Sequence, residues 1–234
     1  MIFHEDTDMK KRTSLCLLAL LLVCTALFSA CGKDAYTLTY ADGAFENAKK
    51  ELAFQEAPVC YRAASALKGE TVANISGFRP NDIPLYAIEG MDADEFLTDD
   101  SFTLYYEKGV KLPTLTELNT SHISLSELGN DIAMEIDRLE DTAAIGELVT
   151  MITDGTSYPS QKLAAYSPKR FEILFFSQDY EGIIYVLEYW KYTDTTTFLD
   201  NGQEINVGKG VVYDRAADRF YIMGDVLENH FINT

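Results

Sequence analysis

The feature that most constrains this fold is a series of strand-like runs in the last third of the chain. Short turns separate the runs, and one of them contains Asn201-Gly202, a dipeptide typical of a tight hairpin. Strands joined by short turns pair with their neighbours in antiparallel order. The sequence therefore predicts an antiparallel sheet of successive hairpins. The runs are rich in aromatic and β-branched side chains and cover residues 171–177, 183–192, 195–199, 203–207, 211–213 and 219–223.

Helical patterns accompany these runs. Asp141 is a candidate N-cap, and apolar residues at helical spacing follow it as far as Gly155. Residues 44–55 and 225–231 also favour helices. We therefore expect the α+β class, with a few helices packed on the sheet and two subdomains, 44–128 and 129–234. Further short strands are expected at residues 59–63, 71–75, 84–89, 102–106, 122–125 and 132–136.

The N-terminal region has the three parts of a secretory signal peptide. The basic residues 10–12 precede an uncharged apolar run at 15–28, and small residues follow. This run is shorter than the ~20 apolar residues that a membrane-spanning helix needs. Leu27-Phe28-Ser29-Ala30-Cys31 resembles the lipobox of bacterial lipoproteins.

That resemblance implies removal of residues 1–30, a lipid (palmitate among its chains) on Cys31, and a short tether over residues 31–43. Localisation would be the extracytoplasmic face of a cell membrane, with the lipid as the link to the bilayer. The alternative is an ordinary secretion signal followed by a chance cysteine. With Cys16 and Cys24 in the leader and Cys31 carrying lipid, Cys60 would remain alone, so no internal disulfide is expected.

The charge of the chain excludes one class of partner. The 234 residues carry a net charge of −18, and residues 1–30 contain as many basic as acidic side chains, so their removal leaves the charge unchanged. A nucleic-acid-binding protein needs Lys and Arg to meet phosphates, so no nucleic acid is expected as partner. The same charge would be repelled by an anionic membrane surface, so a lipid is needed to hold the protein there.

The sequence contains no coherent catalytic set, and neither a cofactor nor a metal is predicted. Cys60 lies in an apolar run, where a small buried thiol is common. The Ser65-x-x-Lys68 pattern lacks the companion motifs of penicillin-binding enzymes. The only cation candidates, which are weak ones, lie in an acidic segment better explained as a solvated loop; they are Asp92, Asp94, Asp99 and Asp100.

One strand-like run offers a ligand-binding surface. In residues 183–192, alternate positions place Glu188, Trp190 and Tyr192 on one face. If that face were open, the rings would form a ledge on which a glycan or peptide could stack. Both faces of the run are apolar, however, and the pattern favours a central strand with these residues in the core.

These observations favour a non-catalytic, lipid-anchored binding or accessory protein. Its ligand would be a protein, a peptide or a cell-wall component. One alternative is a cell-envelope hydrolase that uses a pair of carboxylates, which sequence spacing alone cannot identify. Another is an immunity-type lipoprotein that sequesters a cationic peptide, as the net charge of −18 would allow.

Overall fold

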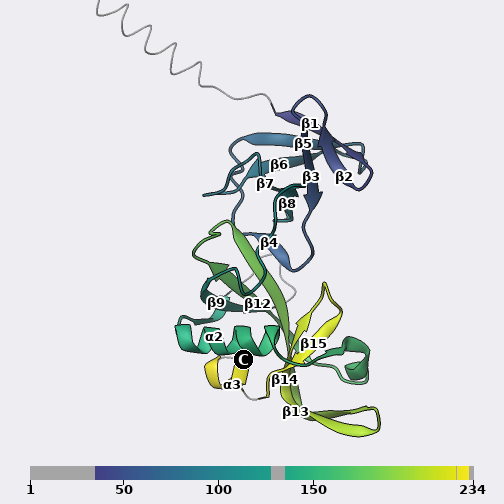
Figure 1. Cartoon of the computed structure of the whole chain (residues 1–234), viewed down its shortest axis with the longest axis vertical. Helices are drawn as coiled ribbons and strands as arrows, with labels where there is room; N and C mark the ends of the chain where they lie inside the picture. The colour runs from purple at the N-terminus through teal and green to yellow at the C-terminus, as the bar shows by residue number, and fades with distance from the viewer. Residues whose placement is uncertain (1–34, 128–134, 225, 232–234) are drawn as a thin grey trace, which may run out of the picture. The chain divides into compact units, whose positions relative to one another are not determined.

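The computed structural model describes residues 35–127, 135–224 and 226–231. This part of the chain is mostly β, and its first strands close into a seven-stranded barrel (Figure 1). The α+β class predicted from the sequence is therefore wrong. The predicted leader and the predicted lipidation site, Cys31, lie outside the described residues. None of the described helices has both the length and the apolar character needed to cross a bilayer.

The barrel is built from the N-terminal strands in the order β1-β2-β3-β8-β7-β6-β5. It closes through a parallel pairing of β1 with β5, in which Leu38 lies opposite Ile75, while its other pairings are antiparallel. Alternate side chains point inward, and Leu38, Phe54 and Leu85 are fully buried in the interior. The strands are β1 (Tyr36–Ala41), β2 (Ala44–Asn47), β3 (Leu52–Glu56), β5 (Thr71–Ser76), β6 (Ile83–Ala87), β7 (Phe96–Thr98) and β8 (Leu104–Glu107).

The helix predicted over residues 44–55 is instead the hairpin of β2 and β3. The Asn47 side chain accepts hydrogen bonds from the backbone N–H groups of Lys49 and Lys50, and this arrangement stabilises a turn. The turn brings Phe45 directly opposite Phe54, and both side chains are buried. A few apolar residues at helical spacing are thus equally compatible with a hairpin when an Asn can form the turn between them.

The second sheet has the order β10-β9-β12-β13-β14-β15-β11, and β4 pairs with β13 beside this series. The predicted hairpins are confirmed, because β12 pairs with β13, β13 with β14 and β14 with β15. Asn201 and Gly202 both have positive φ, as the tight turn requires. The strands are β4 (Tyr61–Ala63), β9 (Thr120–Glu127), β10 (Glu135–Leu139), β11 (Ser157–Pro159), β12 (Lys169–Ser177), β13 (Ile183–Asp200), β14 (Gln203–Asp214) and β15 (Arg219–Ile222).

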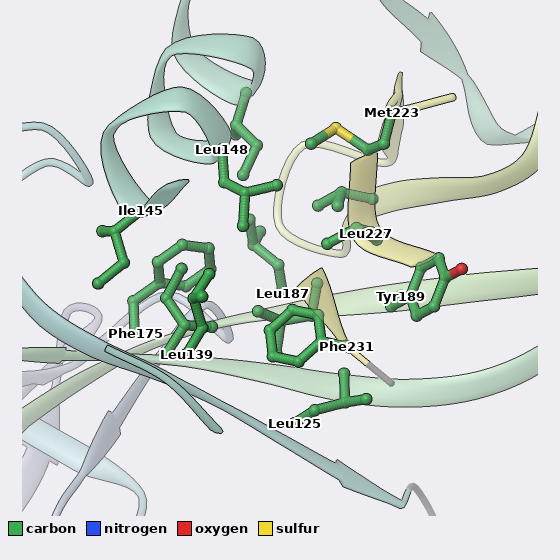
Figure 2. Close-up of a cluster of buried hydrophobic side chains, with 14 of the residues drawn as sticks. Leu125, Leu139, Ile145, Leu148, Phe175, Leu187, Tyr189, Met223, Leu227 and Phe231 are labelled. Atoms are coloured by element: carbon green, nitrogen blue, oxygen red, sulfur yellow. The ribbon is translucent and has the colours of Figure 1, made fainter. Parts of the chain in front are cut away.

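The α-helices of the described residues cover one face of this sheet. Helix α2 (Thr142–Thr153) begins where predicted, and its N-cap Asp141 accepts hydrogen bonds from two backbone N–H groups. Figure 2 shows Ile145 and Leu148 of α2 next to sheet residues such as Phe175 and Leu187, with Leu227 of α3 (Val226–His230) nearby. These residues belong to one core cluster. A 3₁₀ turn, η1 (Ser160–Leu163), follows β11.

The proposed division into subdomains at residues 128 and 129 stays a prediction, since residues 128–134 lie outside those described. The predicted strand at residues 132–136 falls partly in this gap, and β10 begins at Glu135. Residues 36–41 of the predicted tether form β1. Strand β4 belongs to the second sheet although the strands before and after it in sequence belong to the barrel.

Candidate functional site: a polar row and a lysine-lined groove

A row of polar side chains crosses the face of the second sheet that lies opposite the helices. In the strand register, Glu135 lies opposite Ser126, Ser126 opposite Glu172, Glu172 opposite Glu188, and Glu188 opposite Tyr213. Directly opposed residues share a face of the sheet. The fold therefore places two glutamates, Glu172 and Glu188, directly opposite each other on β12 and β13.

Glu172 is held by an arginine from β4. Arg62 donates two hydrogen bonds to the carboxylate, of 2.8 and 3.0 Å, and the Glu172 side chain is only 18% exposed. Bidentate arginine–carboxylate pairs are strong because both partners are charged and their geometries match. This pairing uses both oxygens of Glu172 and requires its ionised form. Arg62 was missed at the sequence level, since it lies 110 residues before its partner.

Glu188, on the same face, is contacted by Trp190 of β13 and by Arg215 in the turn after β14. It accepts a hydrogen bond of 2.8 Å from Trp190 Nε1, and Arg215 Nε lies 3.9 Å from its other carboxylate oxygen. The Trp190 ring lies 4.3 Å from the Tyr213 ring, and the Arg170 guanidinium lies 4.9 Å from the Trp190 centroid. Glu188 and Trp190 are thus buried, with the exposed side chains of Arg170 and Arg215 beside them.

The three residues of the predicted ledge are placed by these contacts. Glu188, Trp190 and Tyr192 are 7%, 7% and 4% exposed, and Trp190 and Tyr192 pack in a cluster with Phe198 and Phe220. This is the placement that the core interpretation predicts. They present little surface on which a ligand could stack, and a ligand-binding role for them stays a prediction.

Near Tyr192, a shallow groove of about 460 Å³ opens where β12 begins, beside the middle of β13. Lys169 and Lys191 lie directly opposite each other in the strand register, and Lys209 comes from β14. A carboxylate oxygen of Glu127 lies 3.9 Å from the Lys169 amine, and one of Glu228 lies 3.5 Å from the Lys191 amine. The groove is lined by Lys169, Lys191, Tyr192, Thr193, Lys209 and Glu228.

This groove was missed at the sequence level, although part of it could have been found. Once residues 171–177 and 183–192 are taken as a hairpin, counting outward from its turn places Lys169 opposite Lys191. The position of Lys209 next to the other two lysines could not be predicted by counting along the strands, because the register of β13 and β14 shifts between Lys191 and Thr196.

The acidic segment is partly structured rather than a solvated loop. Its middle residues form β7, and Asp99 is 7% exposed. Asp99 Oδ1 accepts hydrogen bonds from the backbone N–H groups of Ser101 and Thr103, at 2.8 and 3.0 Å. Asp100 lies 3.0 Å from the amine of Lys68.

The other two cation candidates, Asp92 and Asp94, are exposed, and Asp92 accepts a hydrogen bond from the Asp94 N–H. Across the described ranges, no group of three or more His, Cys, Asp or Glu side chains is placed to hold a metal ion.

The remaining candidates for nucleophilic chemistry are in structural positions. Cys60 is buried, and burial raises the pKa of its thiol to about 11, so it is protonated at neutral pH. Ser65 Oγ accepts a hydrogen bond from the Glu89 N–H. His122 stacks on Phe176 with ring centroids 4.4 Å apart, and His230 Nε2 lies 3.9 Å from the carboxylate of Glu147. Both histidine rings are thus engaged by groups other than the Cys60 thiol.

No protein-family model matches this chain, and neither a curated protein nor a solved structure matches it.

Proposed function

We propose that this chain is a non-catalytic, lipid-anchored binding protein on the extracytoplasmic face of a bacterial membrane. The leader supports the location, because a basic segment, an apolar run and small residues precede Cys31 in a pattern similar to a lipobox. An acidic protein is not drawn to an anionic bilayer by its own charge, so a covalent lipid would supply the attachment.

The choice between binding and catalysis rests on the hydrogen-bond partners and the burial of Glu172 and Glu188. A glycoside hydrolase needs one carboxylic acid that donates a proton and a second carboxylate that is free to act on the sugar or on water. Glu172 has both oxygens engaged by Arg62, and Glu188 is buried and bonded to Trp190 Nε1. The contacts of these two glutamates are those of structural residues, which favours a protein that acts by binding.

Radiolabelled palmitate and cell fractionation test the location. The full chain, expressed in a bacterial host, should incorporate the label and fractionate with membranes, and protease added to spheroplasts should degrade it. Cys31→Ala should abolish labelling and release the protein from the membrane fraction. Cys60→Ala is the matched control, because it removes the other cysteine of the mature chain and should leave both results unchanged. Labelling that survives Cys31→Ala would refute the anchor.

Hydrolysis of purified peptidoglycan tests the absence of catalysis. The wild-type chain and the Glu172→Gln variant should release equally little soluble product. A clear activity that Glu172→Gln removes while the melting temperature is preserved would show that the protein is a hydrolase and that this carboxylate serves catalysis.

A further inference from the structure

The turn between β13 and β14 places an asparagine directly before a glycine on the surface. Asn201 and Gly202 form a two-residue loop, because Asp200 pairs with Gln203 on either side of it, and both loop residues are exposed. Glycine has no Cβ, so its backbone nitrogen is open to an approaching carbon atom. Among the asparagines that the structure describes, Asn201 is the one that a glycine follows.

The hairpin around this turn has little support from other strands. From Thr196 to Asp200, β13 pairs with β14 alone among the described strands. Contacts from η1 hold the hairpin as far as Asp200, whose carboxylate lies 3.0 Å from the Lys162 amine. A turn at the end of two such strands opens locally more easily than the interior of a sheet. Asn201 and Gly202 can therefore adopt conformations in which the side-chain carbonyl carbon of the first meets the backbone nitrogen of the second.

Asn206, four pairs of bonds further along β14, provides a comparison within the same hairpin. The β-branched Val207 follows it, and its side chain accepts a hydrogen bond of 2.8 Å from the Gly208 N–H. The Asn201 amide instead donates to the Asp200 carboxylate, at 3.3 Å. The carbonyl carbon of Asn206 is thus held beside a bulky residue, whereas that of Asn201 lies beside an exposed glycine.

We infer that Asn201 is a site of spontaneous deamidation, with water as the other reactant. The Gly202 nitrogen attacks Cγ of Asn201, a C–N bond forms, the bond from Cγ to Nδ2 breaks, and ammonia leaves with the Gly202 proton. Water then opens the five-membered imide. Opening at Cγ gives aspartate, and opening at the backbone carbonyl gives isoaspartate, in which the chain runs through Cβ and Cγ. The inference does not rest on the proposed binding function.

Either product changes the hairpin. Each adds a negative charge beside Asp200 and so alters its pairing with Lys162. Isoaspartate also adds a carbon atom to the backbone of a loop whose length fixes the register of its strands. We therefore expect the isoaspartate form to lose the pairing of Asp200 with Gln203.

Peptide mapping of the aged protein by mass spectrometry tests the site. The purified full chain in detergent is kept at about pH 8 and 37 °C for several weeks, then denatured and digested with trypsin. Residues 192–209 form one tryptic peptide, which contains both Asn201 and Asn206. Fragmentation should place a mass increase of about 1 Da at Asn201, which should convert at least about tenfold faster than Asn206. A protein isoaspartate methyltransferase should label the product. An unchanged Asn201, or equal conversion at both positions, would overturn the inference.

The turn between β1 and β2 supplies a matched variant. Asp42 and Gly43 form another exposed two-residue loop, with φ of 48° and 85°, as against 49° and 82° at Asn201 and Gly202. Asp42→Asn creates a second Asn-Gly turn of this conformation and should release ammonia at a rate within about threefold of that at Asn201. Release at position 42 without release at Asn201 would refute the assignment.

A second variant removes the reaction. Asn201→Gln would have to close a six-membered ring, so the peptide of residues 192–209 should show no mass increase over the same period. A mass increase that persists in this variant would place the reaction at another residue and refute the inference. Melting temperatures of both variants, measured before ageing, should match that of the wild-type chain, because both residues lie in exposed turns.

Discussion

Asp99 is expected to be one of the main local stabilising residues of the barrel. The perturbation is Asp99→Ala, which removes the acceptor for the Ser101 and Thr103 backbone N–H groups and for the Tyr105 hydroxyl, the last at 3.3 Å. Burial, and then the Asp99 charge, raises the pKa of Tyr105, so this hydroxyl is a donor throughout the neutral range. The same loop holds Phe102 at a positive φ of 61°, a conformation unfavourable for a bulky side chain.

The expected magnitude follows from these contacts. A buried donor left without a partner costs about 1–3 kcal/mol, and in this loop water can reach the Ser101 N–H in part. We therefore expect Asp99→Ala to lower the free energy of unfolding by about 3 kcal/mol. In a domain of this size, that loss corresponds to a drop in melting temperature of about 6–12 °C.

Urea denaturation followed by circular dichroism measures the change. Asp99→Asn is the matched control, because its Oδ1 can keep both backbone hydrogen bonds, and it should cost only about 1 kcal/mol. A loss for Asp99→Ala smaller than about 0.5 kcal/mol would refute the reasoning. Equal losses for Ala and Asn would show that the charge of Asp99, rather than its accepted hydrogen bonds, stabilises the loop.

Two further predictions concern the second sheet. Burial lowers the pKa of His122 below its ordinary value of 6.5. As the pH falls through 6.5, the unfolded chain therefore takes up a proton before the folded chain does, and the free energy of unfolding decreases. His122→Phe keeps a ring against Phe176 and should flatten this decline in urea titrations at pH 7.5 and 5.5; an unchanged slope would contradict the assignment. Gly210→Ala should destabilise the sheet by about 1–3 kcal/mol, because an added Cβ would lie 2.5 Å from the buried Tyr189 ring. Gly146→Ala on α2, where nothing lies within 4 Å of the added Cβ, should instead stabilise by about 0.5–1 kcal/mol, and thermal melts that shift in the same direction for both variants would contradict this steric distinction.

Local signals predicted some elements of this fold correctly. Helix α2 follows from a cap at Asp141 and apolar residues at helical spacing, both of which act within a few residues. The hairpin at Asn201-Gly202 follows from a turn that fixes its own backbone angles. The class of the whole protein could not be predicted in this way, because closure of the barrel depends on the parallel pairing of β1 with β5, some 35 residues apart.

Local signals could likewise predict only part of the candidate site. The opposition of Glu172 to Glu188, like that of Lys169 to Lys191, follows from the register of one hairpin. The partner that makes Glu172 structural, Arg62, comes from a distant strand and has no local signature. The contact that weighs most against a catalytic role for Glu172 is therefore a long-range one.

The position of β4 has a consequence for the order in which the protein assembles. All seven barrel strands lie within residues 36–107, so they can pair before the rest of the chain has been synthesised. Strand β4 lies in the middle of them but finds its partner, β13, only after about 120 further residues have been made. Until then the backbone groups of β4 that β13 will pair with form an open edge, the kind of edge that other chains can join. A chaperone that shields this short segment until β13 has been synthesised would prevent such association.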